Sequence, residues 1–159
     1  MIMKKVLIAL DYDPSAEKIA ETGYALAKAI GADVYLIHVV AEPNYYSSLE
    51  YSPIMGYSGF SSPDMMMGVD DDEVKQASLD FLEQSKKHLG DEQITIMLGE
   101  GDSAEAILKA AKELGADIIV MGTHSRRGLD KILMGSIAEK VLHHADVPLL
   151  IIPTKHEKK

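Results

Sequence analysis

Residues 118–139 read IIVMGTHSRRGLDKILMGSIAE, and this stretch decides the fold class. Its first four residues are all apolar, which is typical of a strand buried on both faces. A helix is expected from Ser136, because Ser136 and Glu139 have the spacing of a capping box. The loop between this strand and this helix contains glycines. Loops in this position expose backbone N–H groups that bind anions.

Strand and helix patterns alternate along the rest of the chain. Asp13 is expected to be the N-cap of the first helix and Pro14 its first residue. Asp102 and Glu105 have the spacing of a second capping box. The predicted strands are 6–10, 33–40, 94–98, 118–121 and 147–153. The predicted helices are 14–30, 74–89 and 103–114, each followed by a glycine, and 136–145.

This alternation predicts an α/β fold of the Rossmann-like kind. We expect a five-stranded parallel sheet in the order 3-2-1-4-5, with helices on both faces. In such sheets ligands bind beyond the carboxyl ends of the strands, where the strand order reverses. That position lies between the first and fourth strands. Asp11 follows the first strand and Gly122 the fourth, so the two residues are expected to meet at one site.

Length, charge and composition limit the class of protein. The 159 residues fit one domain, 1–159, with a solvated tail at 154–159. The net charge of −9 and the pI of about 5.0 argue against a nucleic-acid-binding face. No apolar run has the length of a signal peptide or a membrane span. The absence of cysteine excludes disulfides and thiolate zinc sites. We therefore expect a cytoplasmic protein with no membrane partner.

Residues 41–72 interrupt the alternation. They lack helical and strand periodicity, and they contain three prolines, three glycines, four tyrosines and four methionines. Loops this long inside a domain are either functional or disordered. The aromatic side chains argue against plain disorder. We predict that this segment is a lid over the crevice or a flap that binds a protein partner.

The motifs favour binding over catalysis. No Walker A sequence occurs, and Gly99-Glu100-Gly101 is a lone GxG that is expected to form a turn. No GxSxG elbow, HExxH helix or kinase signature is found, so we assign no catalytic and no metal-ligating residue. His38 is expected to be a satisfied core histidine. Spacing alone leaves two interpretations of the 122–136 loop open: a phosphate site, or a plain connection whose glycines serve geometry.

The chain resembles the universal stress protein family over nearly all of residues 3–153, apart from the 41–72 insert. The resemblance is carried by KKVLIALDYDPSAEKIAE at 4–21, LIHVV at 36–40 and GTHSRRGLDKILMGSIAEKVLHHADVPLLIIP at 122–153. The nucleotide-binding branch of that family has the motif G-x-x-G-x9-G-[ST]. Gly122, the nine-residue spacer, Gly135 and Ser136 match this motif. Ser125 stands where the motif has its second glycine.

The resemblance implies an adenine nucleotide alpha hydrolase-like fold that holds ATP, or AMP or ADP, with Mg²⁺ or Mn²⁺ bound by the phosphates. Asp11 would face the ribose, and Ala9 and Val39 would line the adenine pocket. Ser125 adds a Cβ near the phosphates, although its hydroxyl could donate a hydrogen bond to them. The implied binding residues are Ala9, Asp11, Val39, Met121, Gly122, His124, Ser125, Gly135, Ser136 and Ile137.

Three functions follow from this resemblance. The first is a stress-response regulatory module that binds an adenine nucleotide. The second is a related protein that binds no ATP and acts on a partner through the 41–72 flap. The third is a weak ATPase with slow hydrolysis at most. For the first function, the apolar segment 147–152 at the chain end is expected to be an edge strand that pairs two copies into a homodimer.

Overall fold

Five parallel strands form a single sheet in the order β3-β2-β1-β4-β5, which confirms the predicted order. The computed structural model describes residues 2–12, 14–40, 71–123 and 134–154. The helices and strands in chain order are β1 (Lys5–Ala9), α1 (Ala16–Ile30), β2 (Asp33–Val40), α4 (Asp71–Leu89), β3 (Thr95–Glu100), α5 (Ser103–Leu114), β4 (Ile118–Gly122), α6 (Ser136–His144) and β5 (Leu149–Ile152).

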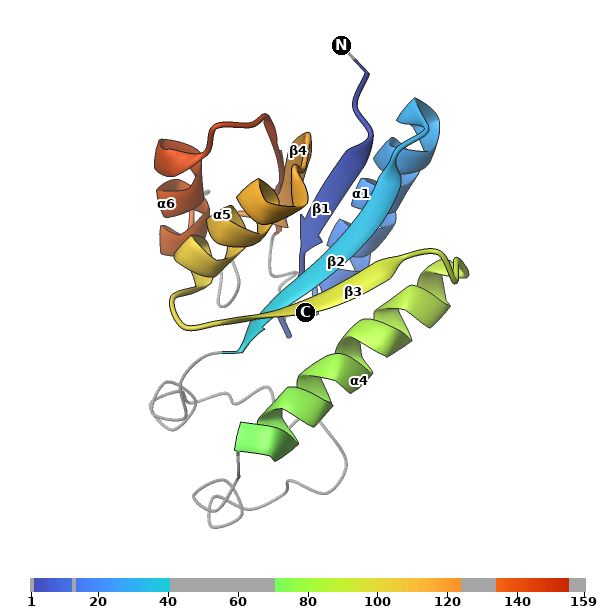
Figure 1. The fold of residues 1–159 in the computed structure, drawn as a ribbon, viewed down its shortest axis with the longest axis vertical. Helices are drawn as coiled ribbons and strands as arrows, with labels where there is room; N and C mark the ends of the chain where they lie inside the picture. The colour runs from blue at the N-terminus through green and yellow to red at the C-terminus, as the bar shows by residue number, and fades with distance from the viewer. Residues whose placement is uncertain (1, 13, 41–70, 124–133, 155–159) are drawn as a thin grey trace, which may run out of the picture.

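The helices form one layer on each face of the sheet. Figure 1 shows α1 and α4 on one side of the strands and α5 and α6 on the other. Two separate hydrophobic cores result, and the central strand β1 contributes side chains to both. Val6 and Ile8 point into the core beneath α1 and α4, whereas Leu7 points into the core beneath α5 and α6. None of these three residues has exposed surface, which confirms a strand covered on both faces.

The helix ends follow from local sequence. Gly31 and Gly115 adopt left-handed conformations, with φ of 71° and 72°, and their N–H groups close the last turns of α1 and α5. At the start of α5, Asp102 Oδ2 accepts a hydrogen bond of 2.9 Å from the backbone N–H of Glu105, as predicted. The Glu105 carboxylate lies 3.5 Å from Lys140 Nζ on α6, so it contributes to an ion pair between α5 and α6.

Several predicted boundaries were wrong by a few residues. Pro14 and Ser15 form a turn, and the first hydrogen bond of α1 runs from Ile19 N to Ser15 O. Ser15 is therefore the N-cap, and Asp13 lies outside the described residues. Helix α6 begins at Ser136, as predicted, but its N-cap is Gly135, whose carbonyl accepts from Glu139 N. Strand β3 ends two residues later than predicted, and β5 is shorter than predicted.

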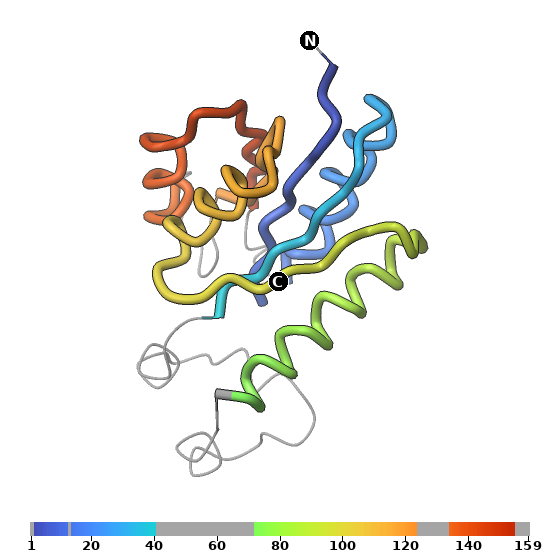
Figure 2. The backbone as a smooth tube through the Cα atoms, in the orientation of Figure 1, coloured from blue at the N-terminus to red at the C-terminus, as the bar shows by residue number. Residues whose placement is uncertain are grey.

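The predicted bounds of the 41–72 segment and of the tail also include residues that belong to the folded part of the structure. Helix α4 begins at Asp71, so the last two residues assigned to the flap belong to a helix, and residues 41–70 lie outside the described part of the chain. Thr154, which was assigned to the tail 154–159, is buried, and its N–H donates to the Thr123 hydroxyl at the end of β4. In Figure 2 the backbone can be followed from β3 through α5 to β4. Among the described residues, no helix has the length and hydropathy of a membrane span.

Candidate functional site

The candidate site lies at the carboxyl edge of the sheet, between β1 and β4. These strands are neighbours, with Ile8 beside Val120, and the chain order reverses between them. Asp11 follows β1, and Gly122 is the last residue of β4. Strand β2 lies on the other side of β1, with Ile37 beside Ala9, so its residue Val39 reaches the same edge. Residues far apart in the chain therefore lie at the same edge of the sheet, where the strand order predicts a ligand.

The loop after β4 is fastened at both of its described ends. Gly135 N donates a hydrogen bond of 2.6 Å to the carbonyl of Thr123, which brings the start of α6 next to the end of β4. Thr123 N donates to Ile152 O at 3.0 Å. Its hydroxyl oxygen accepts from Thr154 N at 3.0 Å. The first turn of α6 is thereby held at the edge of the sheet. His124 and Ser125 lie outside the described residues.

The N-terminus of α6 supplies backbone donors at this edge. Because the first hydrogen bond within the helix is Glu139 N to Gly135 O, the N–H groups of Ser136, Ile137 and Ala138 have no acceptor inside the helix. Ser136 is exposed and Ile137 half-buried. Gly135 differs from this trio, since its own N–H is bonded to Thr123. Together with the helix dipole, the three N–H groups favour an anion.

Gly122 has a packing role that the sequence did not reveal. Its φ is not among the positive values of the described glycines, so it does not serve as a left-handed turn. A Cβ at this position would lie 2.6 Å from Ile19 Cδ1 and 2.9 Å from Thr154 Cγ2. Side-chain atoms of α1 and of the segment after β5 therefore occupy the space, and the glycine lets them pack against the end of β4.

The side chains expected around an adenine divide between the core and the edge. Ala9 and Val39 are half-buried and pack on the α5–α6 side of the sheet. Met121 belongs to the same core and is buried, so its side chain serves packing and its backbone is the part that lies at the edge. Asp11 is half-buried, and its Oδ1 accepts a hydrogen bond of 2.8 Å from Tyr12 N.

His38 contacts the backbone of Leu10, the residue before Asp11. The side chain is 3% exposed. Its Nδ1 donates a hydrogen bond of 3.0 Å to Leu10 O, while Nε2 has no hydrogen-bond partner among the described residues. Burial lowers the pKa of His38 and outweighs the opposing effects of the Leu10 carbonyl and Asp11. The prediction of a core histidine is confirmed, and among the described residues only one of its two ring nitrogens has a hydrogen-bond partner.

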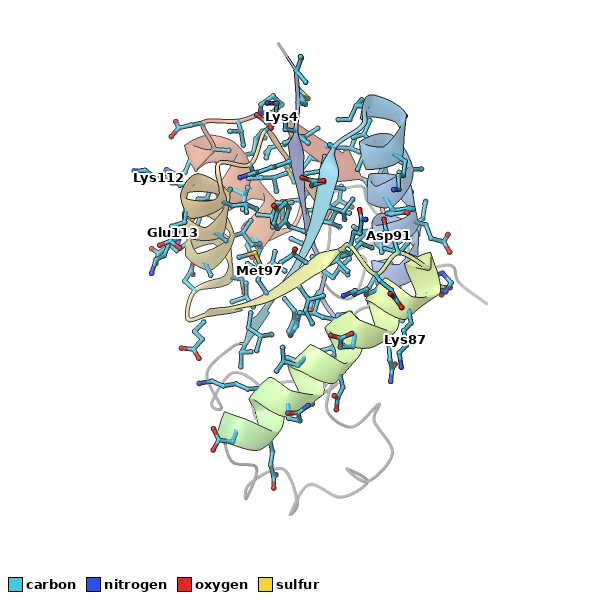
Figure 3. All side chains as sticks on the ribbon, turned by 45° about the vertical axis from the view of Figure 1, so that its right-hand side comes forward. Lys4, Lys87, Asp91, Met97, Lys112 and Glu113 are labelled. Atoms are coloured by element: carbon cyan, nitrogen blue, oxygen red, sulfur yellow. The ribbon has the colours of Figure 1, made fainter. Side chains whose placement is uncertain are left out.

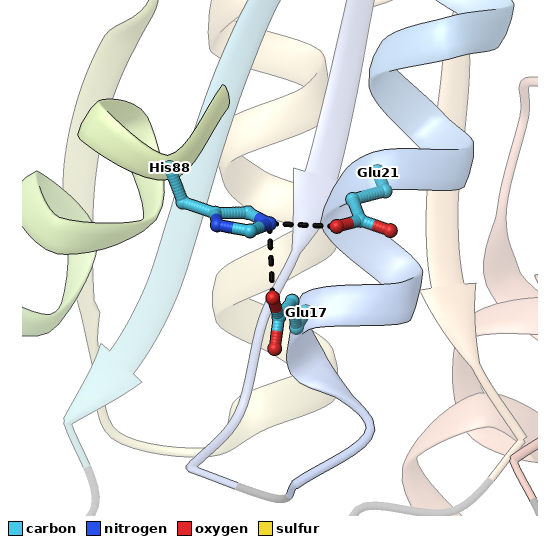
Figure 4. A group of neighbouring side chains, drawn as sticks. All are labelled: Glu17, Glu21 and His88. Carbon is cyan, nitrogen blue, oxygen red and sulfur yellow. Dashed lines mark hydrogen bonds and ion pairs between the residues drawn. The ribbon is translucent and has the colours of Figure 1, made fainter. Parts of the chain in front are cut away.

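A second histidine joins two exposed carboxylates at the contact between α1 and α4. The ring Nε2 of His88 lies 2.6 Å from Glu21 Oε1 and 3.0 Å from Glu17 Oε1 (Figure 4). The hydrogen bond to Glu21 raises the pKa of His88. Nearby, Asp91 accepts from Tyr24 Oη at 3.0 Å and pairs with Lys28 of α1, and Figure 3 shows Asp91 at the end of α4. These polar contacts fasten α4 to α1.

The sequence analysis did not single out the Glu17–Glu21–His88 group. Glu17 and Glu21 are four residues apart on one helix face, which is an ordinary spacing for surface glutamates. His88 comes from another helix, 67 residues after Glu21. The three atoms lie close enough together to surround a cation. A protonated imidazole would neutralise one of the two carboxylates, and the group lies on the α1–α4 side of the sheet, opposite α6.

The strand order, the helices on both faces and the helix N-terminus at the switch point define a doubly wound, Rossmann-like α/β protein. Within that class, the model of the universal stress protein family matches residues 3–153. The chain belongs to the universal stress protein family.

Individual relatives agree with this assignment. The chain is 32% identical over 151 residues to universal stress protein MJ0531 of Methanocaldococcus jannaschii, covering 95% of this chain and 82% of the relative. It is 27% identical over 159 residues to MJ0577 of the same organism, covering 98% of each. The solved structure of MJ0577 superimposes with a TM-score of 0.73 over 99% of this chain. A universal stress protein in complex with cAMP has the same fold, with a TM-score of 0.61 at 18% identity.

The packing role of Gly122 predicts a specific pair of stability changes. Gly122→Ala should lower the free energy of unfolding by roughly 1–3 kcal/mol, because the new methyl overlaps Ile19 Cδ1 and Thr154 Cγ2. Ile19→Val removes that Cδ1. In urea denaturation, the double variant should therefore lose less than the sum of the two single losses. Additive losses would show that the Cβ does not meet Ile19.

The raised pKa of His88 predicts a pH dependence of stability. The unfolded-state pKa is about 6.5, and the folded-state pKa is higher. The contribution of His88 is therefore complete below pH 6.5 and is lost as the pH rises through the folded-state pKa. The difference in urea midpoint between wild type and His88→Gln should shrink over that range. His143→Gln is the control, since His143 lies 3.8 Å from a single carboxylate. A difference independent of pH would contradict the ion pair.

Proposed function

We propose that this protein binds ATP or a related adenine nucleotide at the carboxyl edge of its sheet and acts as a cytoplasmic stress-response regulatory module. The observation that carries the proposal is the N-terminus of α6, with three N–H groups free of helical acceptors, fastened by the Gly135–Thr123 hydrogen bond at the switch point of the sheet. Membership in the universal stress protein family supports it, as does the match of Gly122, Gly135 and Ser136 to the nucleotide-binding motif.

Each part of an adenine nucleotide has a counterpart among the described residues. The phosphates would accept hydrogen bonds from Ser136 and Ile137 N–H and would hold Mg²⁺ or Mn²⁺. The Asp11 carboxylate has the acceptor chemistry that ribose hydroxyls require. Ala9 and Val39 offer half-buried apolar surface for the base. The family relative in complex with cAMP shares only the fold at its level of identity, and its ligand is consistent with this class of nucleotide.

The two other functions make different predictions for the purified protein. A chain in which Ser125 prevents phosphate binding would contain no nucleotide and would act through the 41–70 segment. A weak ATPase would release phosphate slowly, with the bound metal ion and an ordered water as the only requirements. Among the described residues no nucleophile–base pair lies at the edge of the sheet, so nucleotide binding without efficient turnover is the function that the site supports best.

We also propose that two copies pair through β5. This strand is an edge of the sheet. Ile119 N and Thr123 N donate to Pro148 O and Ile152 O, so the carbonyls of even-numbered residues face β4. The backbone groups of Leu149 and Ile151 consequently point to the open side, where a second copy could continue the sheet.

Nucleotide content and binding test the first proposal. Mass spectrometry of the denatured wild type should detect co-purified ATP, AMP or ADP, and calorimetry of the emptied protein should detect binding of Mg-ATP. Gly135→Asp should abolish binding. Aspartate is a good N-cap residue, so α6 should persist while the carboxylate caps its N–H groups and repels the phosphates.

A matched control places the same charge elsewhere along the edge. Ser103→Asp adds a carboxylate to the first turn of α5, which follows the outer strand β3 instead of the switch point. This variant should bind Mg-ATP as wild type does. If the emptied wild type fails to bind Mg-ATP, the proposed function is wrong. If Gly135→Asp binds normally, the phosphates do not lie at α6.

Light scattering tests the proposed dimer. Wild type should have the mass of a dimer at micromolar concentration. Ile151→Pro removes an N–H that faces the open edge and leaves the bonds to β4 in place. This variant should be a monomer with an unchanged circular dichroism spectrum. A monomeric wild type, or a dimeric Ile151→Pro, would contradict pairing through β5.

A further inference from the structure

We propose that His38 is a positioning residue of the nucleotide site: its Nδ1–H sets the orientation of the Leu10–Asp11 peptide, and its aromatic contacts with Tyr12 and Phe81 tie that peptide to α4. This inference rests on the proposed nucleotide function, because Asp11 is the residue that would meet the ribose. It adds a determinant of affinity that makes no contact with the ligand.

Strand β2 holds the chain immediately after β1. Leu10 is the first residue beyond the strand, and both of its backbone polar groups are bonded to consecutive residues of β2. Leu10 N donates to Ile37 O at 2.9 Å, and Leu10 O accepts from His38 Nδ1 at 3.0 Å. A peptide unit is planar. Fixing the Leu10 carbonyl therefore also fixes the direction of the Asp11 N–H at the other end of the same plane.

The hydrogen bond to Leu10 determines which ring nitrogen of neutral His38 carries the proton. A carbonyl oxygen only accepts hydrogen bonds, so the proton of neutral His38 resides on Nδ1. Nε2 is then a buried acceptor, and it has no hydrogen-bond partner among the described residues. An apolar side chain would avoid that desolvation cost. The hydrogen bond to Leu10 is the polar contact that the structure records for His38, so holding this peptide is the function that the contact indicates.

Tyr12 and His38 also contact α4. The rings of Tyr12 and His38 meet edge-on, with centroids 4.5 Å apart, and Phe81 of α4 lies 4.8 Å from Tyr12 and 5.7 Å from His38. The Tyr12 hydroxyl lies 3.0 Å from the hydroxyl of Ser78, which is fully buried in α4. Asp11 is thus bracketed by Leu10, which is held by β2, and by Tyr12, which is held by α4.

This bracket links the ligand to a helix on the opposite side of the sheet from α6. A nucleotide that requires one position of Asp11 also favours the packing of Tyr12 against α4. By thermodynamic reciprocity, loosening α4 must then weaken nucleotide binding by the same factor.

Three substitutions at His38 separate the two ring nitrogens. The side-chain amide of asparagine reaches the position of Nδ1, that of glutamine reaches the position of Nε2, and leucine has neither. His38→Leu and His38→Gln should each weaken Mg-ATP binding about tenfold, which corresponds to the loss of one hydrogen bond. His38→Asn should bind within about threefold of wild type. Ile107→Val, a substitution of a buried α5 residue in the other core, controls for general loss of stability and should leave affinity unchanged.

Spectra without nucleotide test the bracket independently. Long-range ¹H–¹⁵N NMR of the emptied wild type should show His38 protonated on Nδ1. The amide resonances of Asp11 and Tyr12 should shift in His38→Leu and stay near their wild-type positions in His38→Asn. Protonation on Nε2, or equal Mg-ATP affinity of the leucine and asparagine variants, would overturn the inference. A wild type that binds no Mg-ATP would contradict the proposed function, and the spectra alone would then decide whether His38 holds the Leu10–Asp11 peptide.

Discussion

The structure depends on the complete burial of β1 between β2 and β4. Its three central residues have no exposed surface, and burying side chains of this size stabilises a fold by roughly 1.5–3 kcal/mol each. Because side chains of β1 belong to both cores, the strand cannot move toward one helix layer without opening the core beneath the other layer. The neighbouring strands β2 and β4 are therefore held in register. The chain segments that leave the carboxyl ends of these strands all begin at the same edge of the sheet. The candidate site consists of what β1, β2 and β4 bring to that edge.

Two kinds of contact turn this edge into a site. Gly135 N bonded to Thr123 O places the start of α6 against the end of β4, so the helix N–H groups are presented at a fixed position. On the other side, Ile37 and His38 hold the backbone of Leu10 and with it the position of Asp11. The proposed phosphate donors and the Asp11 carboxylate are thus fixed by contacts within the protein itself. Such preorganisation reduces the cost of ordering on binding.

Most of the fold could be predicted from the sequence, because its signals are local. Apolar strands, helical periodicity and terminal glycines specified the alternation, and chain-order rules supplied the sheet order and the edge that Asp11 and Gly122 share. What could not be predicted depends on contacts across the chain. Gly122 makes room for Ile19 and Thr154, the Gly135 N–H is bonded to Thr123, and His88 meets two glutamates of α1. No spacing pattern reports these pairs. His38 was placed correctly in the core, but the state of its two nitrogens required the structure.

The central claim is that an adenine nucleotide binds where β1, β4 and α6 meet. An NMR titration of ¹⁵N-labelled, nucleotide-free protein with Mg-ATP tests it most directly. The backbone amides of Asp11, Val39, Ser136 and Ile137 should shift together with one dissociation constant, while exposed amides of α4 near Lys87 should stay unchanged. Shifts confined to α4 or to the outer edge of β3, or no shifts at millimolar Mg-ATP, would contradict a nucleotide site at this edge.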